Sequence, residues 1–271
     1  MTRVVVGVDG SAGSLSALRW AAGAAAALGA GLRAVAVAAE GVDADAVDSA
    51  RSALDSAIAE SGAAGAVVER DVVSGDPREV LLSEAARADV ALTVVGSTGT
   101  GWFPSMHLGS VGHHLAQHAP GPVAVVPLGA DEFRADATIV GIDGSPGSRA
   151  AAALSARLAA SVHAVHAHQP AARAGAIVDE PDWRERSRRA CEASVAPLVE
   201  SARLADFEIV EGDPAKVLTD AAAASDAGLV ILGSRGAGGF KGLRLGSVAL
   251  RVLHHASRPT IVVPPADGER A

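Results

Sequence analysis

The chain has 271 residues, which is long for one domain and comfortable for two domains of about 130 to 140 residues. Its formal charge of −8 gives it no electrostatic attraction for nucleic acid or anionic lipid, so neither is expected as a partner. No apolar stretch reaches the roughly 20 residues that span a bilayer. Cys191 is the single cysteine, so no internal disulfide can form, and a cytoplasmic location is expected.

Short β-branched runs alternate with longer alanine-rich segments along the whole chain. This alternation predicts βα units and a parallel sheet whose strands are buried on both faces. The strands are expected at residues 3–8, 32–38, 67–72, 91–95 and 122–126, and again at 137–142, 162–167, 207–211, 228–232 and 259–263. Only 19 positions separate Asp143 from Val162, where 23 separate Asp9 from Leu32. The first helix of the second series is therefore expected to be about one turn shorter.

The two series of elements are copies of one another. The matching segments are Val4–Ser11 with Thr138–Ser145, Ser74–Pro77 with Glu211–Pro214, and Leu92–Pro127 with Leu229–Pro264. The order of these landmarks is the same in both halves, so a duplicated domain is the simplest explanation. We expect one domain over residues 1–130 and a second over residues 136–267, joined by a polar stretch.

A glycine-rich loop follows the fourth expected strand of each copy. Its pattern is Gly-x2-Gly-x9-Gly-Ser, which begins at Gly96 in the first copy and at Gly233 in the second. Glycines allow positive φ and close approach, so successive N–H groups can face one anion. A helix that opens at Ser110 or Ser247 adds its positive dipole end. An ordinary strand-to-helix turn is the plainer interpretation of one glycine pair, but the complete spacing, found twice, favours a phosphate site.

This glycine pattern resembles the ATP-binding signature of the universal stress protein family, and the segment 233–263 is similar to that family's C-terminal third. The resemblance covers both halves of the chain. It implies two tandem Rossmann-like α/β domains, each a five-stranded parallel sheet in the order 3-2-1-4-5 with helices on both faces. Strands 1 and 4 would then flank the switch point at which open α/β sheets bind ligands.

The resemblance also implies which residues hold a nucleotide. Asp9 and Asp143 would lie on the adenine and ribose side, and Val37 or Ala167, at the end of the second strand, would cover the base. An Asp-Gly turn after a strand is the alternative explanation for the two aspartates. The candidate nucleotide-binding residues are Asp9, Val37, Gly96, Ser97, Gly99, His107, Gly109 and Ser110 in the first copy, and Asp143, Ala167, Gly233, Ser234, Arg235, Gly236, Lys241, Arg244, Gly246 and Ser247 in the second.

The two loops differ in charge. The second carries Arg235, Lys241 and Arg244, where the first has Thr98, Pro104 and His107. Hydrogen bonds to charged groups contribute about 1.5 to 3 kcal/mol each, so one lost phosphate contact weakens binding about tenfold or more. We therefore expect the second loop to hold polyphosphate better at neutral pH, and protonation of His107 to strengthen the first loop at lower pH. The loops would not differ if these side chains point to solvent.

Calorimetric titration with ATP tests this ranking. Substitution of Gly233 is expected to cost more affinity than substitution of Gly96, because the charged loop would contribute more of the binding free energy. Equal losses from the two substitutions would contradict the ranking.

Neither loop contains a residue that we expect to be catalytic. There is no Asp or Glu from Gly96 to Ser110 or from Gly233 to Ser247, whereas phosphoryl transfer depends on bound metal and on a group that orients the nucleophile. No metal site is predicted either. His114 and His118 have the spacing to share a helix face, but no acidic or thiol ligand accompanies them in the sequence.

The sequence thus favours an ATP-binding regulatory protein of the stress response, which acts through nucleotide-dependent conformation or partner binding. ATP, with or without Mg, is the expected ligand. The alternatives are a slow ATPase, a cAMP-binding protein, for which the charge-poor first loop is suitable, and a scaffold that needs no nucleotide. The family resemblance also implies pairing of the two domains through their fifth strands, and a homodimer is a further option.

Overall fold

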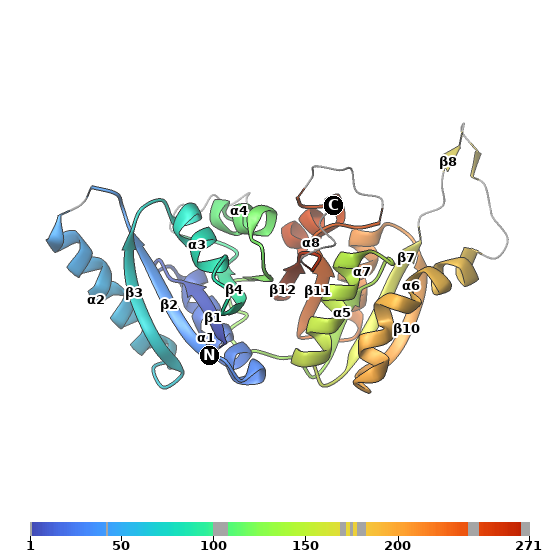
Figure 1. The fold of residues 1–271 in the computed structure, drawn as a ribbon, viewed down its shortest axis with the longest axis horizontal. Helices are drawn as coiled ribbons and strands as arrows, with labels where there is room; N and C mark the ends of the chain where they lie inside the picture. Colours follow the sequence, from blue (N-terminus) through green and yellow to red (C-terminus); the bar gives the residue numbers. More distant parts are fainter. Residues whose placement is uncertain are drawn as a thin grey trace. The chain divides into compact units, whose positions relative to one another are not determined.

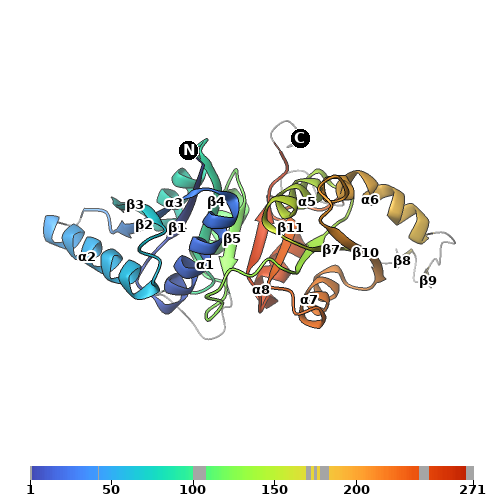
Figure 2. The ribbon, with the colours of Figure 1, turned by 90° about the horizontal axis from the view of Figure 1, so that it is seen from below.

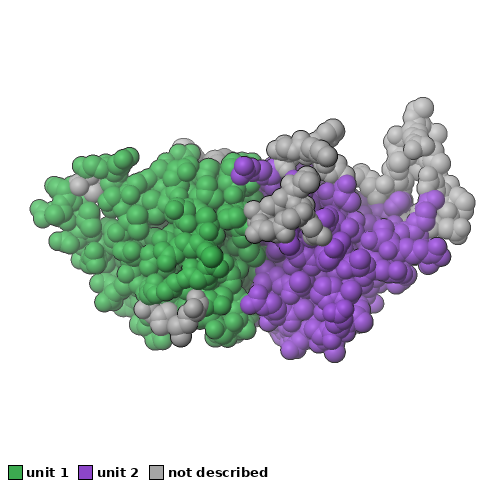
Figure 3. Space-filling model, in the orientation of Figure 1, with its two compact units in different colours: residues 1–133, 256–261 green, residues 134–255, 262–271 purple. Residues whose placement is uncertain are grey.

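The computed structural model describes residues 2–41, 43–99, 108–168, 172–173, 176–177, 183–237 and 244–266. The chain forms two compact units (Figure 3). The first comprises residues 1–133 and 256–261, and the second comprises residues 134–255 and 262–271.

The first repeat is a parallel five-stranded sheet with helices on both faces (Figure 1). Its elements are β1 (Arg3–Gly7), α1 (Ala12–Leu28), β2 (Gly31–Ala38), α2 (Ala44–Ser61), β3 (Val67–Ser74), α3 (Pro77–Ala85), β4 (Val90–Gly96), α4 (Ser110–His118) and β5 (Val123–Val126). The strands lie in the order β3-β2-β1-β4-β5. Helices α1 and α2 cover one face, and α3 and α4 cover the other (Figure 2).

The second repeat has the same order of elements with one addition. Its elements are β6 (Thr138–Gly141), α5 (Pro146–Leu158), β7 (Val162–His168), β8 (Ala172–Arg173), β9 (Ala176–Ile177), α6 (Trp183–Glu200), β10 (Leu204–Glu211), α7 (Pro214–Ala224), β11 (Leu229–Gly233), α8 (Ser247–His255) and β12 (Thr260–Val263). The strands lie in the order β10-β7-β6-β11-β12. The short antiparallel pair β8–β9 is the addition.

Local sequence explains where the helices begin and end. Helix α1 starts after Ser11, whose side chain accepts a hydrogen bond from the Ser14 N–H, and it ends at Gly29 in the left-handed conformation. Ser145 caps α5 in the same way. In the central strand β1, Val4, Val5 and Val6 are fully buried, as a strand covered on both faces requires.

The sequence predicted the fold class and the positions of the ten main strands. The structure confirms an α/β fold with helices on both faces of a parallel sheet. The first helix of the second repeat is indeed one turn shorter, with 13 residues in α5 against 17 in α1. The β8–β9 pair was not predicted, because two-residue strands leave no periodicity in the sequence.

The first helix of each repeat lies against the loop after the fourth strand. A Cβ built on Gly96 would lie 2.7 Å from the Gly13 carbonyl carbon, which belongs to the first turn of α1. In the second repeat, a Cβ on Gly233 would lie 2.7 Å from the Gly147 carbonyl carbon in α5. Both distances are far below van der Waals contact, so the first glycine of each loop is required for backbone packing. The absence of a side chain there lets the first turn of the helix after the first strand lie against the loop after the fourth strand.

We predict that Gly96→Ala and Gly233→Ala each lower the free energy of unfolding, by about 1 to 3 kcal/mol, because the added methyl group meets backbone that cannot move aside. Urea denaturation followed by circular dichroism measures this change. Gly65→Ala is the control, since no heavy atom of the described residues lies within 4 Å of a Cβ at that position. A wild-type unfolding midpoint for Gly96→Ala would contradict the prediction. Substitutions at Gly96 and Gly233 thus mix folding with binding, and other variants are needed to rank the two sites.

Candidate functional site

The candidate site of the first repeat lies where β1 and β4 end side by side. These neighbouring strands are parallel, so their carboxyl ends share one edge of the sheet. The chain leaves β1 toward α1 on one face and leaves β4 toward α4 on the other. Such a divergence opens a crevice at the edge of the sheet, and α/β proteins commonly bind ligands there.

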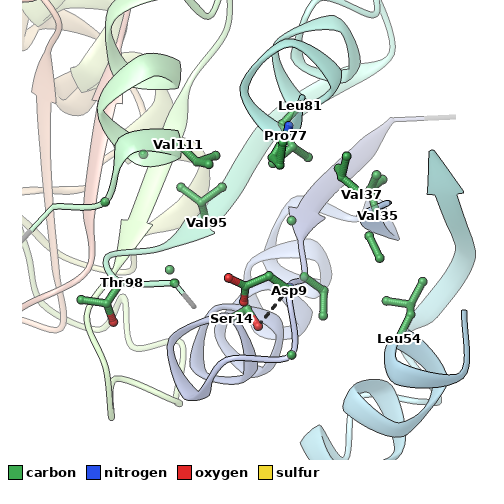
Figure 4. A pocket seen from close by; sticks show the side chains of 18 of the residues that line it. Asp9, Ser14, Val35, Val37, Leu54, Pro77, Leu81, Val95, Thr98 and Val111 are labelled. Atoms are coloured by element: carbon green, nitrogen blue, oxygen red, sulfur yellow. Dashed lines mark hydrogen bonds between the residues drawn. The ribbon is translucent and has the colours of Figure 1, made fainter. Parts of the chain in front are cut away.

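A cavity of about 620 Å³ occupies this crevice, which is a size typical of small-ligand sites. Figure 4 shows the apolar side chains of Val35, Val37 and Leu54 on one side of it and the polar groups of Asp9 and Thr98 on another. The residues that line the cavity are Gly7, Val8, Asp9, Gly10, Ser14, Val35, Ala36, Val37, Ala50, Ala53, Leu54, Pro77, Leu81, Val95, Gly96, Thr98, Gly99, Gly109, Ser110, Val111 and Gly112. The cavity thus offers an apolar wall and a polar wall to one ligand.

Asp9 joins the end of β1 to the glycine loop. Its Oδ1 accepts hydrogen bonds from the Ser11 N–H at 3.0 Å and from the Ser11 hydroxyl at 2.6 Å. Its own N–H donates to the Ser14 hydroxyl at 3.3 Å, as the dashed line in Figure 4 shows. A Cβ on Gly99 would lie 2.7 Å from the Asp9 Oδ2. The second glycine of the loop therefore allows the carboxylate to reach the loop.

The start of α4 forms another part of the cavity wall. Gly109 precedes the helix and, having no side chain, provides no side-chain hydrogen bond to the first turn. The Gly109 N–H donates to the Ser97 carbonyl at 2.7 Å, and the Ser97 N–H donates to the Val126 carbonyl at 2.8 Å, which fixes the loop to β5. Four successive residues from Gly109 to Gly112 line the cavity. Their position puts the positive end of the α4 dipole beside it, which favours an anionic group.

The structure brings together most of the residues predicted for the first site. The predicted residues that line the cavity are Asp9, Val37, Gly96, Gly99, Gly109 and Ser110. Ser97 is buried beside it and acts through its backbone. His107 lies outside the described residues. The contributions of α2 and α3 to the cavity were not predicted from the sequence. Pro77, at the start of α3, belongs to the repeated Gly-Asp-Pro landmark, which could have indicated the contribution of α3.

The carboxylate of Asp76, next to Pro77, is hydrogen-bonded to Arg78. Asp76 accepts hydrogen bonds from the Arg78 N–H and guanidinium, which hold the pKa of its carboxyl well below the usual range. Its counterpart Asp213 has its pKa lowered by the Arg251 guanidinium, which donates two hydrogen bonds to it. Both groups are therefore ionised at neutral pH and are weak bases, which makes them unsuited to take a proton from a nucleophile.

The second repeat has the same backbone framework. Asp143 accepts hydrogen bonds from the Ser145 N–H at 3.0 Å and from the Ala237 N–H of the glycine loop at 2.9 Å. A Cβ on Gly236 would lie 2.6 Å from the Asp143 Oδ2. The Gly246 N–H donates to the Ser234 carbonyl at 2.7 Å, which corresponds to the pair of Gly109 with Ser97. The loop at Gly233 thus has the same shape as the loop at Gly96 where the structure describes both.

The cationic residues of the second loop differ in exposure where the structure describes them. Arg235 is half-buried, and its carbonyl accepts a hydrogen bond from the Ser145 hydroxyl at 3.3 Å. Arg244 and Ser247 are exposed. Ala167 lies on β7 as predicted, whereas Lys241 lies outside the described residues. The greater affinity of this loop for polyphosphate stays a prediction.

The described residues contain no group of three or more His, Cys, Asp and Glu side chains that could hold a metal ion. His114 and His118 do share a face of α4, where their rings stack with centroids 4.4 Å apart. Glu79 lies 3.6 Å from His114, so this pair has one acidic neighbour. Within the same part of the chain, no helix has the length and apolar character that crossing a membrane requires.

Comparison with known proteins gives a consistent result. The sequence profile described as "Universal stress protein family" matches residues 1–127 and again residues 136–264. A universal stress protein of Mycolicibacterium smegmatis is 31% identical over 229 residues, which cover 74% of this chain and 70% of that protein. A universal stress protein of Mycobacterium tuberculosis is 32% identical over 195 residues, which cover 64% of this chain and only 61% of that protein. A solved universal stress protein from Archaeoglobus fulgidus has the same fold, with a TM-score of 0.71 at 19% identity over 97% of this chain and 98% of that one.

Proposed function

Because the chain belongs to the universal stress protein family, we propose that it is an ATP-binding regulatory protein of the stress response. Binding of the nucleotide would change its conformation or its choice of partner, and the protein would work in the cytoplasm. The cavity of the first repeat is the observation that carries this proposal.

The two walls of the cavity suit the two ends of ATP. The apolar wall, from Val35 and Val37 on β2 to Leu54 on α2, suits the flat face of a base. Asp9 offers a carboxylate that accepts hydrogen bonds from ribose hydroxyls. Gly109 and Ser110 place a helix start where the phosphates would lie, and backbone N–H groups at such a position favour an anion.

We propose binding without efficient turnover. The loop between Gly96 and Ser110 contains no acidic residue, and the carboxylate of Asp76 is held by Arg78. The loop therefore has no carboxylate that could orient or deprotonate a water molecule beside a terminal phosphate, and the Asp76 carboxylate is unsuited to do so. A magnesium ion would be held mainly by the phosphates of ATP rather than by the protein.

cAMP is a second candidate ligand for the same cavity. Thr98, which lines the cavity, stands where the second loop has Arg235, so the described part of the first loop offers no cationic side chain to a triphosphate. A cyclic monophosphate needs fewer such contacts. Competition between ATP and cAMP for the wild-type chain decides between them.

Ser110→Glu tests the proposal directly. Ser110 is exposed at the start of α4, and an acidic residue there is compatible with the helix dipole, so the fold should be retained. The new carboxylate would repel the phosphates, and we expect the affinity for ATP in calorimetric titration to fall about tenfold or more. The affinity for adenosine, which has no phosphate, should change much less.

Ser247→Glu is the matched control, because Ser247 is the exposed counterpart at the start of α8. Loss of affinity in one variant alone identifies the repeat that binds the nucleotide. The proposal would be wrong if the wild-type chain bound neither ATP nor cAMP at millimolar concentration, or if freshly purified protein and added nucleotide gave no complex in native mass spectrometry.

A further inference from the structure

The strand register identifies which residues of the second repeat correspond to the cavity wall of the first. Gly7 on β1 pairs with Val35 on β2, and Gly141 on β6 pairs with Val165 on β7. Because Gly7 and Gly141 are equivalent in the repeat, the residue after Val165 is the counterpart of Ala36. That residue is His166. The sequence repeat likewise makes Gly144 the counterpart of Gly10 and Ser148 the counterpart of Ser14.

Gly10, Ser14 and Ala36 all line the cavity of the first repeat. All three counterparts contact α6 in the second repeat. A Cβ built on Gly144 would lie 2.6 Å from the Ala190 carbonyl oxygen. The same construction on Gly10 meets no heavy atom of the described residues within 4 Å. Helix α6 therefore lies directly on the turn after β6, where the first repeat has open space.

Side-chain contacts continue this packing along α6. The Ser148 hydroxyl donates to the Ser194 hydroxyl at 3.1 Å. The His166 Nδ1 lies 2.7 Å from the Ile142 carbonyl oxygen and 3.6 Å from the Cys191 Sγ. Cys191 and Ser194 have no exposed surface, and Ser148 is 2% exposed.

The small side chains of α6 explain how the helix comes so close. Ala190 meets the turn at Gly144, Cys191 meets His166 of β7, and Ser194 meets Ser148 of α5. All three side chains are small. Two further residues of α6, Val195 and Leu198, belong to the core. Moving α6 away would expose Cys191, Val195 and Leu198 to water, which is unfavourable. The helix is thus held in place by its own core contacts.

We propose that α6 and His166 exclude the base of a nucleotide from the second repeat, so that the chain binds one adenine nucleotide, in the cavity of the first repeat. This inference rests on the proposed function. A nucleotide site has one part that holds the phosphates and another that holds the base, and the second repeat keeps only the first of these. The second repeat keeps the glycine loop, with Arg235 and Arg244, but α6 takes the volume that a base would need.

The number of ATP molecules bound per chain is the first test. Calorimetric titration of the whole chain is expected to give one, and two would overturn the inference.

Ala36→His introduces into the first repeat the ring that His166 places in the second, and it should abolish binding of ATP. His166→Ala is the matched control and should leave the affinity unchanged. If Ala36→His does not fold, Ser110→Glu should lower the affinity for ATP about tenfold or more while Ser247→Glu leaves it intact, and the reverse result would overturn the inference.

The reactivity of Cys191 is the second test, and it does not depend on nucleotide binding. Burial and then the negative charge of Asp143 raise the pKa of this thiol from 9.0 to about 11, so about 100-fold less thiolate is present than in the unfolded chain. Iodoacetamide should label Cys191 in the native chain at least about 100-fold more slowly than in urea, and ATP should not change the rate. Because Cys191 is the single cysteine, the labelled mass reports on α6 alone.

Two outcomes of the labelling would overturn the inference. Native labelling as fast as in urea would mean that α6 is not seated, and a rate that changes with ATP would mean that the nucleotide reaches the second repeat. The proposed function fails in a different way. If no ATP binds and the labelling is slow, the nucleotide proposal is wrong while the closed second repeat stands.

Discussion

The close approach of a glycine in the first helix to a glycine at the end of the fourth strand is the contact on which each candidate site depends. In the first repeat Gly13 and Gly96 meet, and in the second Gly147 and Gly233 meet. A methyl group at either position would enter the space of the opposing backbone. Their absence lets the turn after β1 lie against the loop after β4, so Asp9 reaches Gly99 and Asp143 reaches Gly236. The turn after the first strand and the glycine loop after the fourth strand are thereby held against one another.

This contact changes the interpretation of the glycine pattern. From the sequence, all of its glycines were assigned to a backbone cradle for phosphate. In the structure, Gly96 serves the packing of a helix, Gly99 accommodates the Asp9 carboxylate, and Gly109 leaves the start of α4 without a side-chain cap. Only the last role concerns an anion directly. A phosphate-binding pattern can thus persist in a repeat for structural reasons, whether or not that repeat binds a nucleotide.

The sequence predicted the fold because its signals are local. Buried parallel strands require β-branched runs such as Val4 to Val6, and turns between them require Asp-Gly or Gly-Asp-Pro. The polar residues of the first site, Asp9 and Gly96 to Gly99, were predictable for the same reason. Of the apolar wall, only Val37 was predicted, through the family resemblance. Leu54 and Leu81 come from helices whose faces are assigned only when the sheet order and helix tilt are known. Ala50 and Ala53 resemble any other alanine of the chain.

The difference between the repeats was the feature least accessible to sequence. Comparison of aligned loops detects charge, and it favoured the second repeat because of Arg235, Lys241 and Arg244. How closely a helix packs on a turn depends on the distance and tilt of the helix, which the sequence does not give. In sequence, α2 and α6 look alike, since both are 18-residue helices in the same place in the order of elements. The contact of Ser148 with Ser194 joins residues 46 positions apart, beyond any local pattern.

Charge and volume therefore favour opposite repeats, and they do so through different terms of the binding free energy. A cationic side chain strengthens the hold on phosphate only after the ligand has room, and its contribution is about 1.5 to 3 kcal/mol for each charged hydrogen bond. Entry of a base into the second repeat would require α6 to leave core contacts made by Val195 and Leu198, whose burial contributes about 1.5 to 3 kcal/mol for each side chain, in addition to the contact of Ser148 with Ser194. The loss from opening is at least as large as the gain from one such cation, which is why we expect the base to bind in the first repeat. The cations of the second loop can then act only on a ligand that has phosphate and no base.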